Sequence, residues 1–177
     1  MTFRKYARGL LLCLMLAEAA LANRLEPSNG QALYQALIDA RAGDVVSLRR
    51  GVYVMPSDIS IMRADVAVRG AGKDKTILDF SAVSDAAQAL LIRASGVSVS
   101  DLTIRNPPGD GVVSRNVGNL TFESIKVIWQ DPKKAGGYGI YPVLANNVLI
   151  KGCEAYGANE AGIYVGQTKR AQVLDNI

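Results

Sequence analysis

The sequence predicts a parallel β-helix, a fold in which the chain winds into stacked coils of short strands. Two observations lead to this prediction: a phrase that returns at a nearly constant spacing, and apolar residues that alternate within it. Gly139-Ile140-Tyr141, for example, returns 23 residues later as Gly162-Ile163-Tyr164. Short strands repeated at a fixed period are typical of solenoids, because each repeat forms one coil and stacking buries a continuous core.

Four copies of a second phrase occupy the later part of the chain. They begin at Gly96, Asn119, Asn147 and Arg170, so their offsets are 23, 28 and 23 residues. Within the copies apolar residues recur at every second position, which is the pattern of a strand with one buried face. Parallel neighbours lie about 4.8 Å apart, so equivalent residues of successive coils form columns. One inward column is predicted to contain Leu102, Ile125, Cys153 and Asn176.

The columns also assign individual side chains. Cys153 is interpreted as a small core residue rather than a reactive thiol, because it stands in the inward column. Asn176 departs from the apolar pattern of that column and is interpreted as part of an asparagine ladder at a turn. Lys126 and Glu154 fall on the outward side one coil apart, which predicts a surface ion pair of small energetic value.

The first 22 residues have the pattern of a secretory signal peptide. Arg4, Lys5 and Arg8 precede an apolar stretch, Gly9 to Leu16, that is too short to cross a bilayer. Ala20-Leu21-Ala22 then fits a cleavage site. We therefore expect a signal peptide over residues 1–22 and a periplasmic or extracellular location. No second apolar stretch is long enough to predict a membrane span.

Composition excludes several kinds of function. Removing residues 1–22 takes away three positive charges and one negative charge, which lowers the net charge from +4 to +2. The remaining charge predicts no nucleic-acid partner. The chain contains no histidine, so a histidine base or a histidine-ligated zinc ion is excluded within it. Cys153 is the only cysteine left after cleavage, so no intrachain disulfide is expected.

The remaining residues, 23–177, are predicted to form one β-helix domain, with a leading segment and helical cap over 23–45 and coils over 46–177. Ser28 or Asn29 can cap a helix from about Gln31 to Ala42, whose spaced apolar residues would cover the N-terminal end of the core. No comparable cap precedes Ile177. We therefore expect a truncated solenoid that continues into further coils, or association of copies through the open C-terminal coil.

Three segments carry a resemblance to a known group of proteins. Residues 42–53 (AGDVVSLRRGVY) and 68–78 (VRGAGKDKTIL) resemble the first strands of pectin-lyase-like right-handed β-helix proteins. Residues 138–177 are similar to a bacterial group of exported β-helix repeat proteins. The resemblance implies a right-handed solenoid with an outer groove for polysaccharide. It implies no single activity, because the fold serves lyases, hydrolases, epimerases, adhesins and binding proteins.

One short stretch bears on catalysis. Residues 138–143 (YGIYPV) resemble the Y-G-[FI]-D-P-H motif of mannuronan C5-epimerases, but Tyr141 stands in place of the aspartate and Val143 in place of the histidine. The sequence thus leaves open whether the protein is an enzyme. A lyase or C5-epimerase would need a tyrosine or lysine as its base, or residues on further coils. The catalytic candidates are Tyr141, Tyr164 and Lys134.

The candidate binding residues gather around the repeated tyrosines. Tyr141 and Tyr164 share an outward column one coil apart, where they can form a platform for a sugar ring or a purely structural ladder. Tyr138 and Glu160 lie beside them. Five extra residues between Trp129 and Tyr138 predict a protruding loop. Its Lys133 and Lys134 either meet uronate carboxylates or belong to an ordinary solvated charged loop.

No metal or cofactor is predicted. Asp101 and Asp175 share a column but lie three coils apart, too far to bind one calcium ion. The leading hypothesis is an exported protein that binds acidic polysaccharide, with lyase- or epimerase-like proton abstraction next to a uronate carboxylate as a further option. The alternative is a non-catalytic structural or adhesive β-helix.

Overall fold

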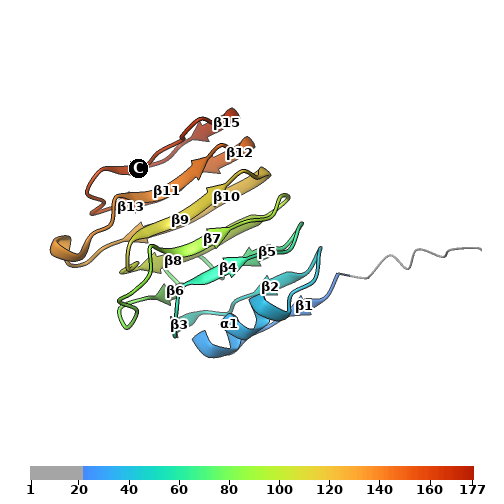
Figure 1. Cartoon of the computed structure of the whole chain (residues 1–177). Helices are drawn as coiled ribbons and strands as arrows, with labels where there is room; N and C mark the ends of the chain where they lie inside the picture. Colours follow the sequence, from blue (N-terminus) through green and yellow to red (C-terminus); the bar gives the residue numbers. More distant parts are fainter. Residues whose placement is uncertain (1–21) are drawn as a thin grey trace, which may run out of the picture.

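The computed structural model describes residues 22–177, so the predicted signal peptide lies outside the described residues except for Ala22. These residues form a parallel β-solenoid whose coils rise from the N-terminal to the C-terminal end (Figure 1). Every strand pair is parallel. The predicted fold class is therefore confirmed.

Two sheets make up the walls of the solenoid. The larger sheet follows the order β1-β2-β5-β8-β10-β12-β15, with β3, β6 and β13 continuing its coils. Its strands are β1 Arg24–Leu25, β2 Val45–Ser47, β3 Gly51–Val54, β5 Ala67–Arg69, β6 Thr76–Asp79, β8 Ser98–Arg105, β10 Gly118–Ile128, β12 Asn146–Lys151, β13 Glu154–Tyr156 and β15 Lys169–Leu174. The second sheet contains β4 Ile59–Ile61, β7 Gln88–Ile92, β9 Asp110–Arg115, β11 Tyr138–Val143 and β14 Ala161–Ile163.

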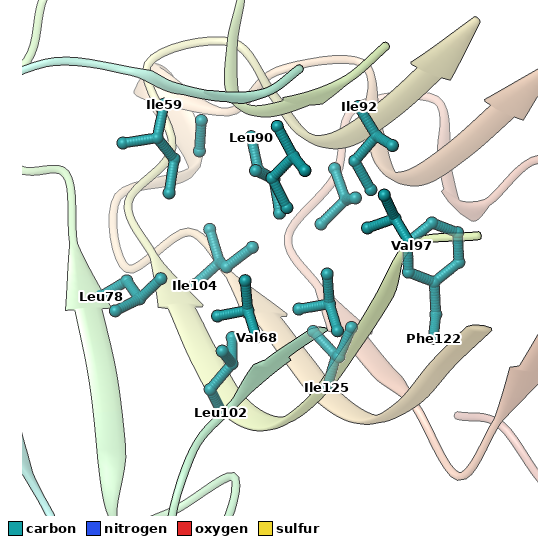
Figure 2. Packing of buried hydrophobic residues seen from close by; sticks show 14 of the residues in the cluster. Ile59, Val68, Leu78, Leu90, Ile92, Val97, Leu102, Ile104, Phe122 and Ile125 are labelled. Carbon is teal, nitrogen blue, oxygen red and sulfur yellow. The ribbon is translucent and has the colours of Figure 1, made fainter. Parts of the chain in front are cut away.

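The strand register agrees with the repeats in the sequence. Phe122 pairs with Val99 on one side and Ile150 on the other, and Ile125 pairs with Leu102. Cys153 is fully buried, and burial raises the pKa of its thiol, as expected for a core residue. Figure 2 shows how Leu102, Ile125, Phe122 and their neighbours fill the interior between the two sheets.

The corners of the solenoid depend on residues with left-handed backbone. Asp65, Gly96, Asn119, Asn147 and Arg170 occupy equivalent positions, and their φ angles lie between 54° and 76°. Glycine, asparagine and aspartate adopt this conformation at the least cost, which explains their periodic recurrence.

Asparagine side chains contribute at two different turns. The Asn147 amide donates to the Asn119 side chain at 2.8 Å, which is an asparagine ladder. Asn176, predicted to join such a ladder, instead caps the neighbouring coil. Its Oδ1 accepts from the Cys153 amide at 2.8 Å, and its Nδ2 donates to the Ile150 carbonyl.

A helix closes the N-terminal end of the core. Helix α1, Gly30–Asp39, places Leu33 and Leu37 in the interior, and the Asn29 side chain accepts from the Ala32 amide at its start. The helix ends before the predicted Ala42. The buried Asp44 side chain accepts from the Arg41 amide at 2.8 Å, and this bond stabilises a turn in place of further helix.

Candidate functional site

Three tyrosine rings form a cluster on the outer face of β11 and β14. The ring centroids of Tyr138 and Tyr141 lie 4.6 Å apart, those of Tyr138 and Tyr164 lie 5.2 Å apart, and those of Tyr141 and Tyr164 lie 5.4 Å apart. The Tyr138 and Tyr164 rings are stacked, with an interplanar angle of 25°. Tyr164 is 41% exposed. We call these three residues the tyrosine face.

Tyr138 joins this face because the strand alternation slips by one residue. In a regular strand, residues three apart point to opposite sides. Here both intervening residues face inward: Ile140 is in the core, and a Cβ added to Gly139 would lie 2.9 Å from the Ala155 Cβ. The same Cβ would lie 2.4 Å from the Gly162 carbonyl oxygen, so only glycine fits at position 139.

Glu160 holds the Tyr138 ring in place. The Tyr138 hydroxyl donates to the Glu160 carboxylate, and this bond, with a smaller contribution from burial, raises the pKa of Tyr138 to about 12. Asp110 supports the same strand from the coil below, since its Oδ1 accepts from the Tyr138 amide at 3.0 Å. The Tyr138 phenol therefore stays protonated at neutral pH and is a hydrogen-bond donor rather than a base.

An arginine that the sequence analysis missed lies beside the tyrosine face. The guanidinium carbon of Arg115 is 5.8 Å from the centroid of the Tyr141 ring, within cation–π range. Arg115 is exposed and forms no ion pair with any residue in 22–177. The 28-residue offset that aligns Gly111 with Gly139 also aligns Arg115 with Val143, so the register could have placed it on the edge of this face.

The two predicted lysines belong to the loop between β10 and β11. A short 3-10 helix, η1 Pro132–Lys134, forms there, and the Asp131 side chain caps it by accepting from the Lys133 amide at 3.0 Å. Lys133 is exposed, and Lys134 lines a hollow together with Trp129. The end of the loop reaches the tyrosine face, because the Gly137 carbonyl accepts from the Glu160 amide at 3.0 Å.

The predicted pair on the opposite sheet is part of a larger charge cluster. Lys126 lies 3.4 Å from Glu154, as predicted, and also 2.7 Å from Asp74. Lys73 forms a second ion pair with Glu154. Lys73 and Asp74 come from the segment between β5 and β6, which covers this face. We call Lys73, Asp74, Lys126 and Glu154 the charge cluster.

Within residues 22–177, no group of three or more acidic or cysteine side chains is placed to hold a metal ion. The same residues include no helix with the length and apolar character needed to cross a membrane.

The architecture and the aromatic outer face together define a parallel β-helix of the kind that presents its side chains in columns. Residues 51–177 match the family described as the right handed beta helix region, and the chain belongs to this family. No significant match is found among curated protein sequences.

Two solved structures share this fold. One is an alginate lyase from a Paenibacillus species, with 16% identity, a TM-score of 0.62, and coverage of 81% of this chain and 50% of that one. The other is a pectin methylesterase mutant in complex with a hexasaccharide, with 15% identity, a TM-score of 0.57, and coverage of 77% of this chain and 49% of that one. This chain thus spans about half the length of both structures.

Proposed function

We propose that the protein binds acidic polysaccharide across its tyrosine face. The observation that carries this proposal is the tyrosine cluster beside an exposed arginine that pairs with no carboxylate in residues 22–177. Aromatic rings offer flat apolar surface to the faces of sugar rings. A free guanidinium binds carboxylates through two parallel hydrogen bonds, so Arg115 would favour uronates over neutral sugars.

The relatives support the choice of ligand class. Both similar structures have names that tie them to polysaccharide, one as an alginate lyase and one in complex with a hexasaccharide. Repeated tyrosines on successive coils match the repeated units of such a polymer. We place the protein outside the cytoplasm, in the periplasm or beyond the cell, on the pattern of residues 1–22.

Catalysis would require a proton transfer in addition to binding. Proton abstraction next to a uronate carboxylate needs a base within reach of the proton. Tyr138 is unsuited to this role because its phenol is held protonated by Glu160. Tyr141, Tyr164 and Lys134 remain the candidates, and binding without chemistry is the function that the geometry supports best.

A pair of exposed tyrosines provides the test. Tyr164 on the tyrosine face is 41% exposed, and Tyr156 on the opposite sheet is 40% exposed. We expect Tyr164→Ala to weaken binding of polygalacturonate or alginate about tenfold, or ~1.4 kcal/mol, in calorimetric titrations. Tyr156→Ala should bind like the wild type. Equal affinities for the two variants would contradict the proposal.

A structural role for the tyrosines is the second candidate. It is favoured by the mutual contact of the three rings, whose stacking between coils stabilises a solenoid. Under this alternative, Tyr141→Ala and Tyr164→Ala lower the free energy of unfolding and no uronate polymer binds. Denaturant unfolding and titration of the same variants distinguish the two functions.

A further inference from the structure

A notch opens where the chain passes from the larger sheet to the second sheet. The connection between β8 and β9 is the short turn 106–109, whereas the connections above and below it are longer, 129–137 and 80–87. Figure 1 shows both longer loops projecting on the same side of the solenoid. The short turn forms the floor between them, and the hollow has a volume of about 490 Å³. Sites for small molecules typically measure about 300–1,000 Å³.

The notch has an apolar lining with polar groups at its rim. Phe80 and Trp129 are buried in its walls, and the half-buried Val83 and Pro108 offer apolar surface. Trp129 is fixed in orientation, because its indole N–H donates to the Pro107 carbonyl at 3.0 Å. A rigid apolar wall of this kind suits the face of a sugar ring.

Three rim side chains keep hydrogen-bonding capacity free. Within residues 22–177, three groups have no side-chain or backbone partner: the side-chain amide nitrogen of Gln130, one carboxylate oxygen of Asp131 and the Lys134 ammonium. By contrast, both polar atoms of the Asn106 side chain have partners. Its Nδ2 donates to the Ser81 hydroxyl and to the Gln130 side-chain carbonyl, and its Oδ1 accepts from the Gln130 backbone N–H. The free set contains neutral donors, one anion that accepts from hydroxyls, and one cation that binds a carboxylate.

We propose that this notch is a second carbohydrate site, separate from the tyrosine face, that holds one or two rings of a uronate saccharide. The ring face would lie on Val83 and Pro108. Gln130 and Asp131 would bind hydroxyl groups, and Lys134 would bind the carboxylate. The choice of a uronate rests on the proposed function, whereas the site itself rests on the two long loops and their free groups.

The single tryptophan of the chain makes the notch observable by itself. Titration with digalacturonate should change the emission of Trp129 saturably, because the ligand would lie against the wall that this residue forms. Lys134→Ala should raise the half-saturating concentration about tenfold, as expected when a hydrogen bond to a charged group is lost. The matched control is Lys75→Ala, which removes the same charge at an exposed position outside the notch lining.

Two results would overturn the inference: an unchanged Trp129 emission in the wild type, or equal half-saturation for Lys75→Ala and Lys134→Ala. The tyrosine face is tested separately in the same assay. Tyr164→Ala should keep the full Trp129 response, even though its affinity for long polymers falls. A silent Trp129 together with Tyr164-dependent polymer binding would reject the notch and leave the proposed function standing.

Discussion

The two outer faces of the solenoid use charge in opposite ways. On the larger sheet, the charge cluster pairs Lys126 with Asp74 and Glu154, and Glu154 also pairs with Lys73. These groups are partly covered, since the side chains of Lys126 and Glu154 are 22% and 13% exposed. Beside the tyrosine face, Arg115 is exposed and pairs with no acid in the part of the chain that the structure describes.

The difference separates stability from binding. The paired charges of the charge cluster lie where the segment between β5 and β6 covers the sheet, and they connect coils that are distant in the chain. Lys73, for example, also donates to the Gly152 carbonyl. A cation that has only an aromatic neighbour retains its capacity for an external carboxylate. Mutations on the two faces should therefore change different properties, and the predictions below are ordered by the size of the expected effect.

The largest effect is expected from Glu154→Gln. This change leaves Lys73 and Lys126 close together without their shared acid, and we expect the free energy of unfolding to fall by about 2 kcal/mol, between the values for exposed and buried pairs. Denaturant unfolding measures the change, and polysaccharide affinity should stay constant. Glu123→Gln is the control, because Glu123 and Lys151 form an exposed pair at 4.0 Å. Equal destabilisation by both variants would contradict the claim that the charge cluster stabilises the fold more than an exposed ion pair does.

A smaller effect is expected from Arg115→Gln on the tyrosine face. We expect affinity for polygalacturonate to fall about fivefold, the value of an exposed charge pair, because the guanidinium no longer meets a carboxylate. Affinity for a neutral polymer, and the free energy of unfolding, should not change. Arg50→Gln, at an exposed position distant in the chain, serves as the control. An equal loss for charged and neutral polymers would contradict the role of Arg115.

The charge cluster should also give a pH dependence. Hydrogen bonds from Lys73 and Lys126 hold the pKa of Glu154 and of Asp74 below their usual values of 4.5 and 3.8. Their contribution to stability is complete above those values and is lost as the pH falls through the lowered pKa values. We expect the unfolding free energy to drop in acid, and to drop less steeply in Glu154→Gln. Parallel acid profiles for the two proteins would contradict this assignment.

The smallest effect concerns the Tyr138 phenol. Its pKa is raised from 10.0 to about 12, first by the hydrogen bond to Glu160. The stabilisation from this bond is therefore complete below pH 10 and is lost as the pH rises through about 12. An ultraviolet titration should show one tyrosine that ionises late. That late step should disappear in Tyr138→Phe and move to lower pH in Glu160→Gln.

The sequence predicted the regular part of the fold well. Gly96, Asn119 and Asn147 fall in register as predicted, because equal coil lengths leave parallel strands only one way to stack their apolar columns. The family resemblance is confirmed by the match over residues 51–177. The position of the extra residues also predicted the loop 129–137, which separates the notch from the next coil.

The irregular parts could not be predicted from the period. Thr103 follows the inward-facing Leu102, so strict alternation would turn it outward. It is buried instead, because the segment that contains Lys73 folds over it and accepts its hydroxyl hydrogen bond. Tyr138 joins the tyrosine face through a local slip at Gly139, which strict alternation does not contain. Helix α1 ends early because of the side-chain bond of Asp44. The roles assigned to Lys133 and Lys134 stay predictions.

The central claim is that one outer face, and not the other, meets the polysaccharide. Hydroxyl-radical footprinting tests it directly, because Tyr164 and Tyr156 start from nearly equal exposure, 41% and 40%. With polygalacturonate present, we expect the oxidation rate of Tyr164 to fall severalfold relative to that of Tyr156, which also corrects for radicals consumed by the sugar. An unchanged ratio, or protection of Tyr156 in place of Tyr164, would contradict the account.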